Sequence, residues 1–260
     1  MTSKTDASTA SPTARATSPR AALVTGGSRG IGLAIAEALA AEGFALTISA
    51  RGAGPLDEAA DRLRAAGAQV LAVPADASDP DDLAALLDAH ERAYDRLDAL
   101  VLNAGMGFAS PIADTPLRRL DTHIALNLRG TFALTSAAIP LLRRTAEADP
   151  RGARVIAIAS LAGLMAEPGL GAYGATKAAV VSLCEAVCAE EGASGVSATA
   201  LCPGYVDTDM AAWKHGDLDP QRMIRASDIA ELAVSITRLS RNAAVPVIAV
   251  HRADGGLRGA

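Results

Sequence analysis

A tyrosine and a lysine four residues apart form the most informative pair in this sequence. Tyr173 and Lys177 stand in the run "YGATK", and the chain has only three tyrosines and three lysines. Chance alone would supply about 0.03 such pairs. Residues i and i+4 share a helix face, and a nearby ammonium favours the phenolate of a tyrosine whose free pKa is about 10. The pair therefore predicts a tyrosine of lowered pKa that exchanges a proton with a substrate oxygen near neutral pH. The alternative is a half-buried aromatic residue beside a solvated lysine.

Ser160 stands thirteen residues before Tyr173, directly after the apolar run "VIAIA". A serine at the carboxyl end of a buried strand is placed to hydrogen-bond a carbonyl oxygen on which negative charge develops. Serine is also a common turn or helix cap. No histidine or nucleophile elbow accompanies it, which argues against hydrolysis. We interpret Ser160 as a hydrogen-bonding group and not as a nucleophile.

The stretch "LVTGGSRGIG" joins a short apolar run to a helical pattern through several glycines. Three of them, Gly26, Gly30 and Gly32, suit three tasks: a tight turn, close approach of a pyrophosphate, and close packing of a helix on a strand. The helix that begins near Gly30 would offer free N–H groups to phosphates. A glycine-rich turn without a ligand is the alternative. Its position in the first strand–helix unit favours a dinucleotide site.

The end of the second strand-like run bears on the choice of dinucleotide. An acid there would bind the ribose 2′-hydroxyl of NAD, whereas a 2′-phosphate requires a cation. The run "LTISAR" has Ala50 at the acid position and Arg51 next, and Arg29 lies inside the glycine stretch. Two cations without an acid favour NADP(H), unless both arginines are merely solvated.

Short β-rich runs alternate with alanine-rich helical stretches from residue 21 onward. The expected strands are 21–25, 44–50, 69–73, 97–102, 153–159, 195–201 and 245–250, and the expected helices are 30–42, 55–66, 80–93, 117–146, 171–191 and 226–240. This alternation predicts one doubly wound, Rossmann-type parallel seven-stranded sheet with helices on both faces. Pro140 predicts a kink or a break in the helix over 117–146.

Length and composition indicate a single α/β domain. The chain has 260 residues, of which 50% are hydrophobic, so one large core over residues 21–260 is feasible. Residues 1–20 are rich in Ser, Thr, Ala and Pro and predict a disordered extension. A net charge of -5 argues mildly against nucleic acid and anionic membranes as partners, and no apolar run approaches the roughly 20 residues that span a bilayer.

The three cysteines, Cys184, Cys188 and Cys202, cannot form a disulfide framework. This favours a cytoplasmic location. No nearby Cys or His completes a metal set with Cys184 and Cys188, so we interpret these two as small core residues and expect no metal site.

The spacing Thr-Gly-x-x-x-Gly-x-Gly, together with "YGATK", resembles the short-chain dehydrogenase/reductase family. The resemblance runs from about residue 21 over nearly the whole chain. It includes the "NAG" segment Asn103–Ala104–Gly105, the asparagine of "HIALNLRGTF", and the segment "PGYVDTDM", which is similar to 3-oxoacyl-(acyl carrier protein) reductases. Six matches occur in the family's order.

The resemblance implies roles for particular residues. Asn127 would hold a water that connects the lysine to solvent, Asp76 would contact the adenine edge, and Asn103 would steady the central strands. The implied catalytic set is Asn127, Ser160, Tyr173 and Lys177. The implied cofactor-binding set is Gly26, Ser28, Arg29, Gly30, Ile31, Gly32, Arg51, Asp76, Asn103, Ala104, Gly105, Tyr173, Lys177, Pro203, Gly204, Val206 and Thr208.

Outside these motifs the pattern is less specific. The segment "MAAWKHGDLDPQRMIR" would form a lid over the substrate, with Trp213 on the substrate or in a structural contact. An apolar substrate wall, or ordinary core, is expected from Met106, Phe108, Leu161, Met165 and Leu170. His123 is interpreted as a surface or core residue without a catalytic role.

The C-terminus departs from the family. Val245-Pro246 and an inserted-looking His251-Arg252 replace the usual pattern near the last strand. The helices over 117–146 and 171–191 still resemble the surfaces through which relatives dimerise, so a homodimer or homotetramer is expected.

The sequence therefore predicts an NADP(H)-dependent reductase that transfers a hydride between nicotinamide and a ketone or secondary alcohol, with a 3-oxoacyl thioester as one candidate. Its partner would be a small carbonyl or alcohol substrate. Two alternatives stay open: a non-catalytic NADP(H)-sensing regulator, and an epimerase or dehydratase that uses a transient hydride step.

Overall fold

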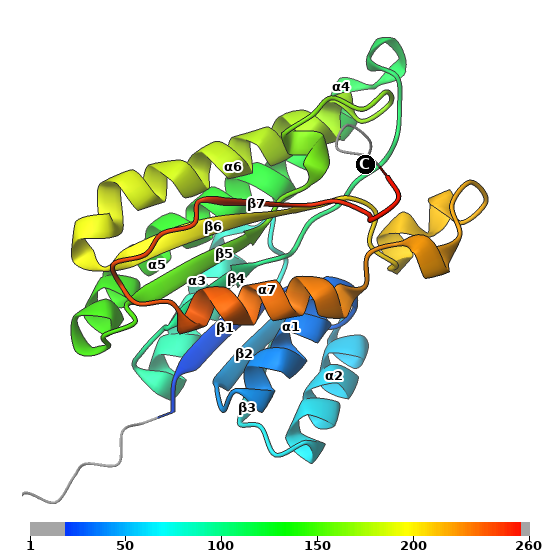
Figure 1. The fold of residues 1–260 in the computed structure, drawn as a ribbon. Coiled ribbons are helices and arrows are strands. Elements are labelled where there is room, and N and C mark those ends of the chain that lie inside the picture. Colours follow the sequence, from blue (N-terminus) through cyan, green and yellow to red (C-terminus); the bar gives the residue numbers. More distant parts are fainter. Residues whose placement is uncertain (1–18, 256–260) are drawn as a thin grey trace, which may run out of the picture.

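Seven parallel strands form one sheet in the order β3-β2-β1-β4-β5-β6-β7 (Figure 1). The computed structural model describes residues 19–255, so most of the extension expected over residues 1–20 lies outside it, as do residues 256–260. The strands are β1 (Ala21–Thr25), β2 (Ala45–Ala50), β3 (Val70–Pro74), β4 (Ala99–Leu102), β5 (Ala153–Ile158), β6 (Val196–Pro203) and β7 (Val247–Val250). The seven-stranded parallel sheet expected from the alternating pattern is confirmed.

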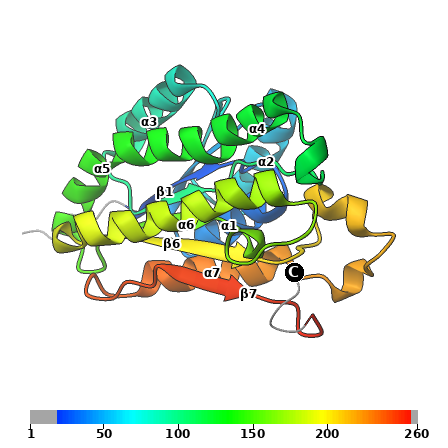
Figure 2. The same ribbon diagram turned by 90° about the horizontal axis from the view of Figure 1, so that it is seen from above.

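Helices cover both faces of the sheet. They are α1 (Gly30–Ala41), α2 (Ala53–Ala65), α3 (Pro80–Tyr94), α4 (Leu117–His123), α5 (Thr131–Ala148), α6 (Gly171–Glu191) and α7 (Ala226–Arg238). Leucines and valines of α3, α5 and α6 fill one apolar layer, and residues of α1, α2 and α7 fill the layer on the opposite face. Figure 2 shows α3, α5 and α6 running along the same face. The central strands between the two layers are buried on both faces and consist mostly of Ala, Val, Leu and Ile, with a few buried polar residues such as Thr47 and Arg154.

The strand order reverses between β1 and β4, which are neighbours in the sheet although β2 and β3 intervene in the chain. In an open parallel sheet, ligands bind in the crevice outside the carboxyl ends of the strands at such a switch point. We call this side of the sheet the carboxyl edge. The turn after β1, the segment after β4 and the residues after β5 and β6 all open onto it.

The helix expected over 117–146 is present, but its interruption lies elsewhere than at Pro140. A π-helical turn, Ile124–Gly130, joins α4 to α5, and Pro140 lies inside α5. The expectation of a break at Pro140 was therefore wrong. Pro140 and Ser136 are both exposed, so water can take the carbonyl that the missing N–H leaves free. The π turn instead fits the approach of the β3–α3 loop, because a Cβ at Gly130 would overlap the carbonyl oxygen of Ala77.

Two helical stretches, Leu117–Ala148 and Gly171–Ser194, are long and apolar enough to cross a membrane by length and composition. Polar residues interrupt both stretches, so neither is an unbroken apolar run in the sequence. Both stretches contribute side chains to the apolar layer on one face of the sheet. Since core helices pass the same test, this property is weak evidence for a membrane.

Candidate active site

The turn after β1 is shaped by its glycines. Gly26 and Gly30 have φ angles of 64° and 55°, a region that residues with a Cβ rarely occupy. A Cβ at Gly32 would overlap the carbonyl oxygen of Gly26 and the side chain of Asn103. The chain therefore folds back tightly at Gly26 and lets α1 pack directly against the turn at Gly32, as the sequence predicted.

The start of α1 is suited to an anion. Arg29 is the N-cap residue, its side chain makes no capping hydrogen bond, and no acidic residue lies in the first turn. The N–H groups of a helix start and its positive dipole end attract phosphate when nothing else satisfies them. Ser28 and Ile31 belong to the same turn. The cradle thus fits the pyrophosphate of a dinucleotide.

Asn103 fastens the segment after β4 to the glycine turn. Its Nδ2 donates to the carbonyl oxygens of Thr25 and Gly26 at 3.1 Å and 3.0 Å. The main-chain N–H groups of Asn103 and Ala104 both donate to Thr25 Oγ1, at 3.0 Å and 3.1 Å. Thr25 was missed by the sequence analysis, although it directly precedes the glycines. Hydrogen bonds therefore hold the two segments together at the switch point.

Two arginines flank the place where a 2′-phosphate is expected. Arg51 is exposed at the end of β2 and acts electrostatically on Asp76. The pKa of Asp76 lies below its usual value, first because Ser78 donates to it from its side chain and main chain, and also because of Arg51. Arg29 is turned toward Asp209, with Nη1 at 2.9 Å from Oδ2. Both cations are present, and each faces a carboxylate.

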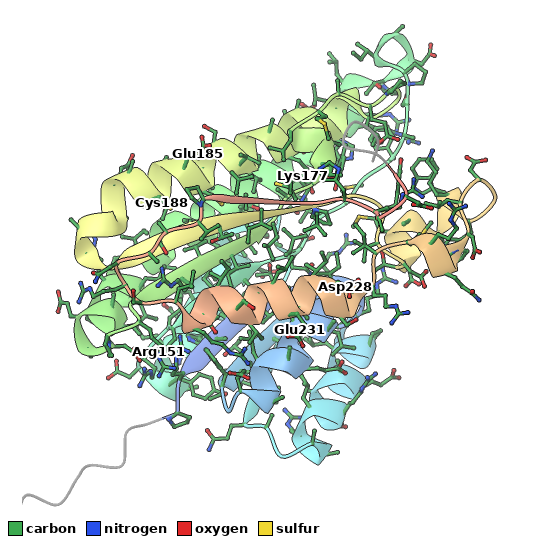
Figure 3. All side chains as sticks on the ribbon, viewed as in Figure 1. Arg151, Lys177, Glu185, Cys188, Asp228 and Glu231 are labelled. Atoms are coloured by element: carbon green, nitrogen blue, oxygen red, sulfur yellow. The ribbon has the colours of Figure 1, made fainter. Side chains whose placement is uncertain are left out.

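Ser160, Tyr173 and Lys177 meet beside the ends of β5 and β6. Tyr173 lies in the first turn of α6, and its side chain shares a hydrogen bond with Ser160. Lys177, one turn later, is buried, and its Nζ donates to the carbonyl oxygen of Ile158 at 2.6 Å. The Lys177 Nζ lies 5.7 Å from the centre of the Tyr173 ring. Figure 3 places Lys177 beneath α6, near the carboxyl ends of β6 and β7.

The protonation states differ from the sequence prediction. Burial raises the pKa of Tyr173 to about 12, although the hydrogen bond with Ser160 opposes this change. Burial also lowers the pKa of Lys177 to about 8. The prediction of a lowered tyrosine pKa was therefore wrong for the protein without cofactor. The pKa of Tyr173 rises because burial desolvates the phenolate. The Lys177 ammonium does not offset this effect, since it donates to the main-chain carbonyl of Ile158.

Asn127 occupies the π turn and ties it to the site. Its Oδ1 accepts from the N–H of Met106 at 2.9 Å, while its Nδ2 donates to the carbonyl of Met106 at 2.9 Å and to Thr176 Oγ1 at 3.2 Å. A Cβ at Gly105 would lie 3.3 Å from Asn127 Oδ1 and 3.5 Å from Lys177 Nζ. Asn127 Oδ1 and Lys177 Nζ thus both border the same space beside Gly105. Thr176, inside "YGATK", is a partner that the sequence analysis missed.

His123 is a core residue. Its ring stacks on Phe108 with the centroids 4.5 Å apart and meets the Tyr173 ring edge-on at 6.2 Å. Among the residues that the structure describes, neither ring nitrogen has a hydrogen-bond partner, and burial holds the pKa of His123 below its usual value. His123 thus lies between Phe108, on which it stacks, and the ring of Tyr173.

The segment after β6 passes over the carboxyl edge. Val206 pairs with Ile224, and two 3₁₀ turns, Asp209–Lys214 and Pro220–Arg222, lie between them. We call residues 209–222 the cover segment; it stands out from the sheet in both views (Figures 1 and 2). Trp213, half-exposed within it, meets the Tyr205 ring edge-on at 6.0 Å.

Tyr205 links the cover segment to the loop between Ser160 and Tyr173. Its hydroxyl donates to Glu167 Oε1 at 2.5 Å. No sequence signal could have found this contact, because the two residues are 38 positions apart and belong to irregular loops.

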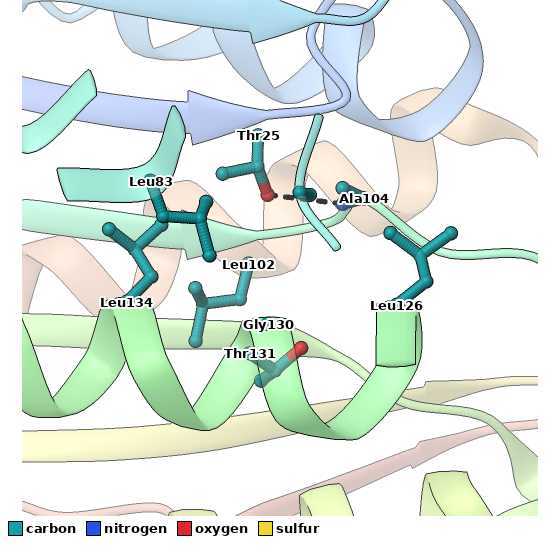
Figure 4. A pocket seen from close by; sticks show the side chains of 9 residues that line it. Thr25, Leu83, Leu102, Ala104, Leu126, Gly130, Thr131 and Leu134 are labelled. Carbon is teal, nitrogen blue, oxygen red and sulfur yellow. Dashed lines mark hydrogen bonds between the residues drawn. The ribbon is translucent and has the colours of Figure 1, made fainter. Parts of the chain in front are cut away.

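A small cavity lies beside Thr25 and Ala104, where the glycine turn meets α5 (Figure 4). Its volume of about 10 Å³ is about the least that can hold one water molecule, so it cannot hold the substrate. Within residues 19–255, no three His, Cys, Asp or Glu side chains are grouped to hold a metal ion.

A family model described as short chain dehydrogenase matches residues 20–218. The chain belongs to this family. A 2-(R)-hydroxypropyl-CoM dehydrogenase of Xanthobacter autotrophicus is 36% identical over 200 residues, with 75% of this chain and 78% of the relative covered. The recognition made from the glycine spacing and "YGATK" is confirmed.

Solved structures of the family have the same fold. An alcohol dehydrogenase of the archaeon Thermococcus sibiricus, complexed with 5-hydroxy-NADP, has a TM-score of 0.82 and 27% identity, covering 90% of this chain and 97% of that one. A 3-oxoacyl-[acyl-carrier protein] reductase of Brucella melitensis, in complex with NAD, has a TM-score of 0.81 and 30% identity, covering 92% and 97%. The chain is thus an oxidoreductase of the short-chain family that acts on CH–OH or C=O groups.

Proposed function

We propose that this protein is an NADPH-dependent reductase of ketones, which also runs in reverse as a secondary-alcohol dehydrogenase. The observation that carries the proposal is the meeting of Ser160, Tyr173 and Lys177 at the carboxyl edge, beside a glycine turn suited to a pyrophosphate. These groups are those that proton transfer to a carbonyl oxygen requires.

The bound nicotinamide supplies the hydride donor or acceptor. In the reducing direction Tyr173 donates its proton to the substrate oxygen. A pKa of about 12 keeps the phenol protonated at neutral pH, which suits this role. Ser160, already hydrogen-bonded to Tyr173, steadies the oxygen as negative charge develops on it.

Lys177 has two tasks in this proposal. Its ammonium orients the cofactor by donating to the ribose hydroxyls, and it stabilises negative charge near Tyr173. Asn127, which borders the same space beside Gly105 as Lys177, would hold the water through which the lysine exchanges protons with solvent.

Arg29 and Arg51 support NADP(H) over NAD(H). One solved relative is complexed with an NADP derivative and another with NAD. The choice of cofactor therefore depends on the residues of this chain. Arginine binds phosphate through charge-assisted hydrogen bonds, and β2 ends in Ala50, which offers no carboxylate to a ribose hydroxyl.

For the substrate we propose a ketone, with a 3-oxoacyl thioester as the first candidate. The 30% identity to the Brucella 3-oxoacyl reductase supports this. Met106 and Phe108, which flank Gly107 at its close approach to the Tyr173 ring, would supply apolar surface for the substrate. A homodimer or homotetramer through α5 and α6 also stays a proposal; Phe132 on α5 is 57% exposed.

The test is NADPH oxidation, followed by absorbance, against a panel of ketones, aldehydes and 3-oxoacyl thioesters. Turnover with at least one ketone is expected. Tight cofactor binding without any turnover would instead favour a sensor. A product formed without net NADPH consumption would favour the epimerase or dehydratase alternative.

A further inference from the structure

One ion pair connects the glycine turn to the cover segment. Arg29 Nη1 lies 2.9 Å from Asp209 Oδ2, although the two residues are 180 positions apart. The Thr208 side chain also lies close to the glycine turn here, because a Cβ at Gly30 would lie 3.3 Å from Thr208 Cγ2. Asp209 is the first residue of the cover segment. The pair therefore joins the glycine turn to the cover segment at the carboxyl edge, where a dinucleotide would bind.

This pair can be exchanged easily. Both side chains are 75% exposed. Exposed ion pairs contribute little to stability and weaken further in salt. A phosphate dianion offers more negative charge and more acceptor oxygens than a carboxylate, and it fits a guanidinium bidentately. Arg29 would therefore leave Asp209 for a phosphate within its reach.

We propose that Asp209 is a specificity-determining residue for the cofactor, because it competes with the 2′-phosphate for Arg29. NADP(H) draws Arg29 away and separates Asp209 from the glycine turn, whereas NAD(H), which has no 2′-phosphate, leaves the pair in place. This inference rests on the part of the proposed function that assigns a phosphate to Arg29.

The competition has a direct consequence for affinity. Part of the binding free energy of NADP(H) is used to break the pair, so Asp209 reduces the preference for NADP(H) over NAD(H). Removing its charge should increase that preference. The expected change is small, about two- to fivefold in Kd, because the pair is exposed.

Asp209→Asn keeps the size of the side chain and removes its charge. We expect its Kd for NADP⁺, measured by calorimetry without substrate, to fall about two- to fivefold, with a smaller change for NAD⁺. Asp207→Asn is the matched control. It removes the same charge two residues earlier, where Asp207 pairs with His215 at 3.5 Å. Asp207→Asn should change the Kd for NADP⁺ and the Kd for NAD⁺ by the same factor.

Arg29→Ala tests the other partner. In that background Asp209→Asn should no longer change the ratio of the two Kd values. The ratio is the Kd for NAD⁺ divided by the Kd for NADP⁺, and the proposal predicts that Asp209→Asn raises it. If Asp209→Asn leaves this ratio unchanged or lowers it in the wild-type background, the proposal is overturned. An equal rise in the ratio for Asp207→Asn also overturns it, since the effect would then be general electrostatics.

Trp213 supplies a second readout. It is the only tryptophan of the chain and follows Asp209 by four residues. Its fluorescence should be quenched more strongly by acrylamide with saturating NADP⁺ than with NAD⁺, and Asp209→Asn should remove this difference. Equal quenching in the wild type with both cofactors contradicts the proposed separation.

These binding measurements are independent of turnover. A shifted ratio without reduction of any carbonyl would retain the role of Asp209 and reject the proposed activity. Turnover of a ketone with an unshifted ratio would do the reverse.

Discussion

Burial, more than the neighbouring ammonium, controls the protonation of Tyr173. Lys177 Nζ bonds to the Ile158 carbonyl, so its charge is directed at the main chain and the tyrosine pKa rises to about 12. A protonated phenol suits donation to a carbonyl oxygen. The reverse reaction requires a phenolate, so alcohol oxidation should be favoured by alkaline pH.

Tyr173→Phe removes the hydroxyl and leaves the ring against His123. We expect kcat/KM for ketone reduction to fall roughly 10²- to 10⁴-fold, because proton transfer is lost, while the Kd for NADP⁺ changes little. Steady-state kinetics and calorimetry measure the two quantities. Tyr94→Phe is the control: Tyr94 donates to the Leu46 carbonyl and lies outside the site, so its loss should leave turnover intact. A Tyr173→Phe enzyme with wild-type turnover would refute the catalytic role.

The pKa of Lys177 should set an upper pH limit on the rate of ketone reduction. With a pKa of about 8, Lys177 carries its charge below pH 8 and loses it above. The rate of ketone reduction, measured at saturating cofactor, should therefore be level up to about pH 8 and decline at higher pH. Lys177→Arg keeps its charge throughout this range, so its lower activity should show no such decline. An identical decline in both enzymes would assign it to another group.

At this scale the sequence predicted residues that belong to contiguous motifs. Gly26, Gly32 and Asn103 have the local geometry expected of them. The Tyr205–Glu167 bond and the Phe108–His123 stack could not be predicted, because each depends on how separate loops pack. The tyrosine pKa was mispredicted for a related reason: spacing reveals a neighbouring charge but not burial.

The most consequential element is the helical run from α4 through the π turn to α5. The wider turn carries Asn127 into the site and brings Gly130 against the loop that holds Asp76. Sequence periodicity predicted a long helix and its ends to within two residues. It could not reveal the π turn, because a single inserted residue hardly alters the apolar pattern. Pro140 was a misleading signal, since its missing hydrogen bond falls on the exposed face.

Gly130→Ala tests this packing. The added methyl would meet the Ala77 carbonyl, so the β3–α3 loop must shift. We expect a loss of about 1–3 kcal/mol in the free energy of unfolding, measured by urea titration, and weaker NADP⁺ binding. Gly54→Ala in α2 is the matched control, because nothing lies within 4 Å of its Cβ position. It should be neutral or stabilising. If both variants behave alike, the contact with Ala77 has no structural importance.

For the whole molecule, the two apolar layers hold the sheet and leave its carboxyl edge open for the cofactor. The doubly wound fold follows from the strand–helix alternation, and the sequence predicted all seven strands. Substrate choice could not be predicted, because the cover segment and the loop over Glu167 have no repeating pattern. The segment after β7 also contacts the cover segment in a way that no pattern reveals: Arg252 and Asp254 form an ion pair, and Arg222 of the cover segment also binds Asp254.

Ligand binding should stabilise the folded molecule. A ligand at 100 times its Kd adds about 2.7 kcal/mol to the free energy of unfolding. At equal concentrations, 2′,5′-ADP should therefore raise the Tm more than 5′-AMP, because only the former has a 2′-phosphate for Arg29 and Arg51 to bind. Differential scanning fluorimetry measures this, with Arg51→Ala expected to reduce the difference. A larger shift with 5′-AMP would argue for NAD(H).

The most direct test follows the hydride itself. NADPH deuterated at C4, in each of its two epimeric forms, is incubated with the protein and a ketone that the panel identifies, and the alcohol is analysed by mass spectrometry. We expect deuterium on the carbinol carbon from one epimer only, one NADP⁺ formed per alcohol, and little product with Tyr173→Phe. Alcohol without deuterium from either epimer, or undiminished labelling by Tyr173→Phe, would contradict this expectation.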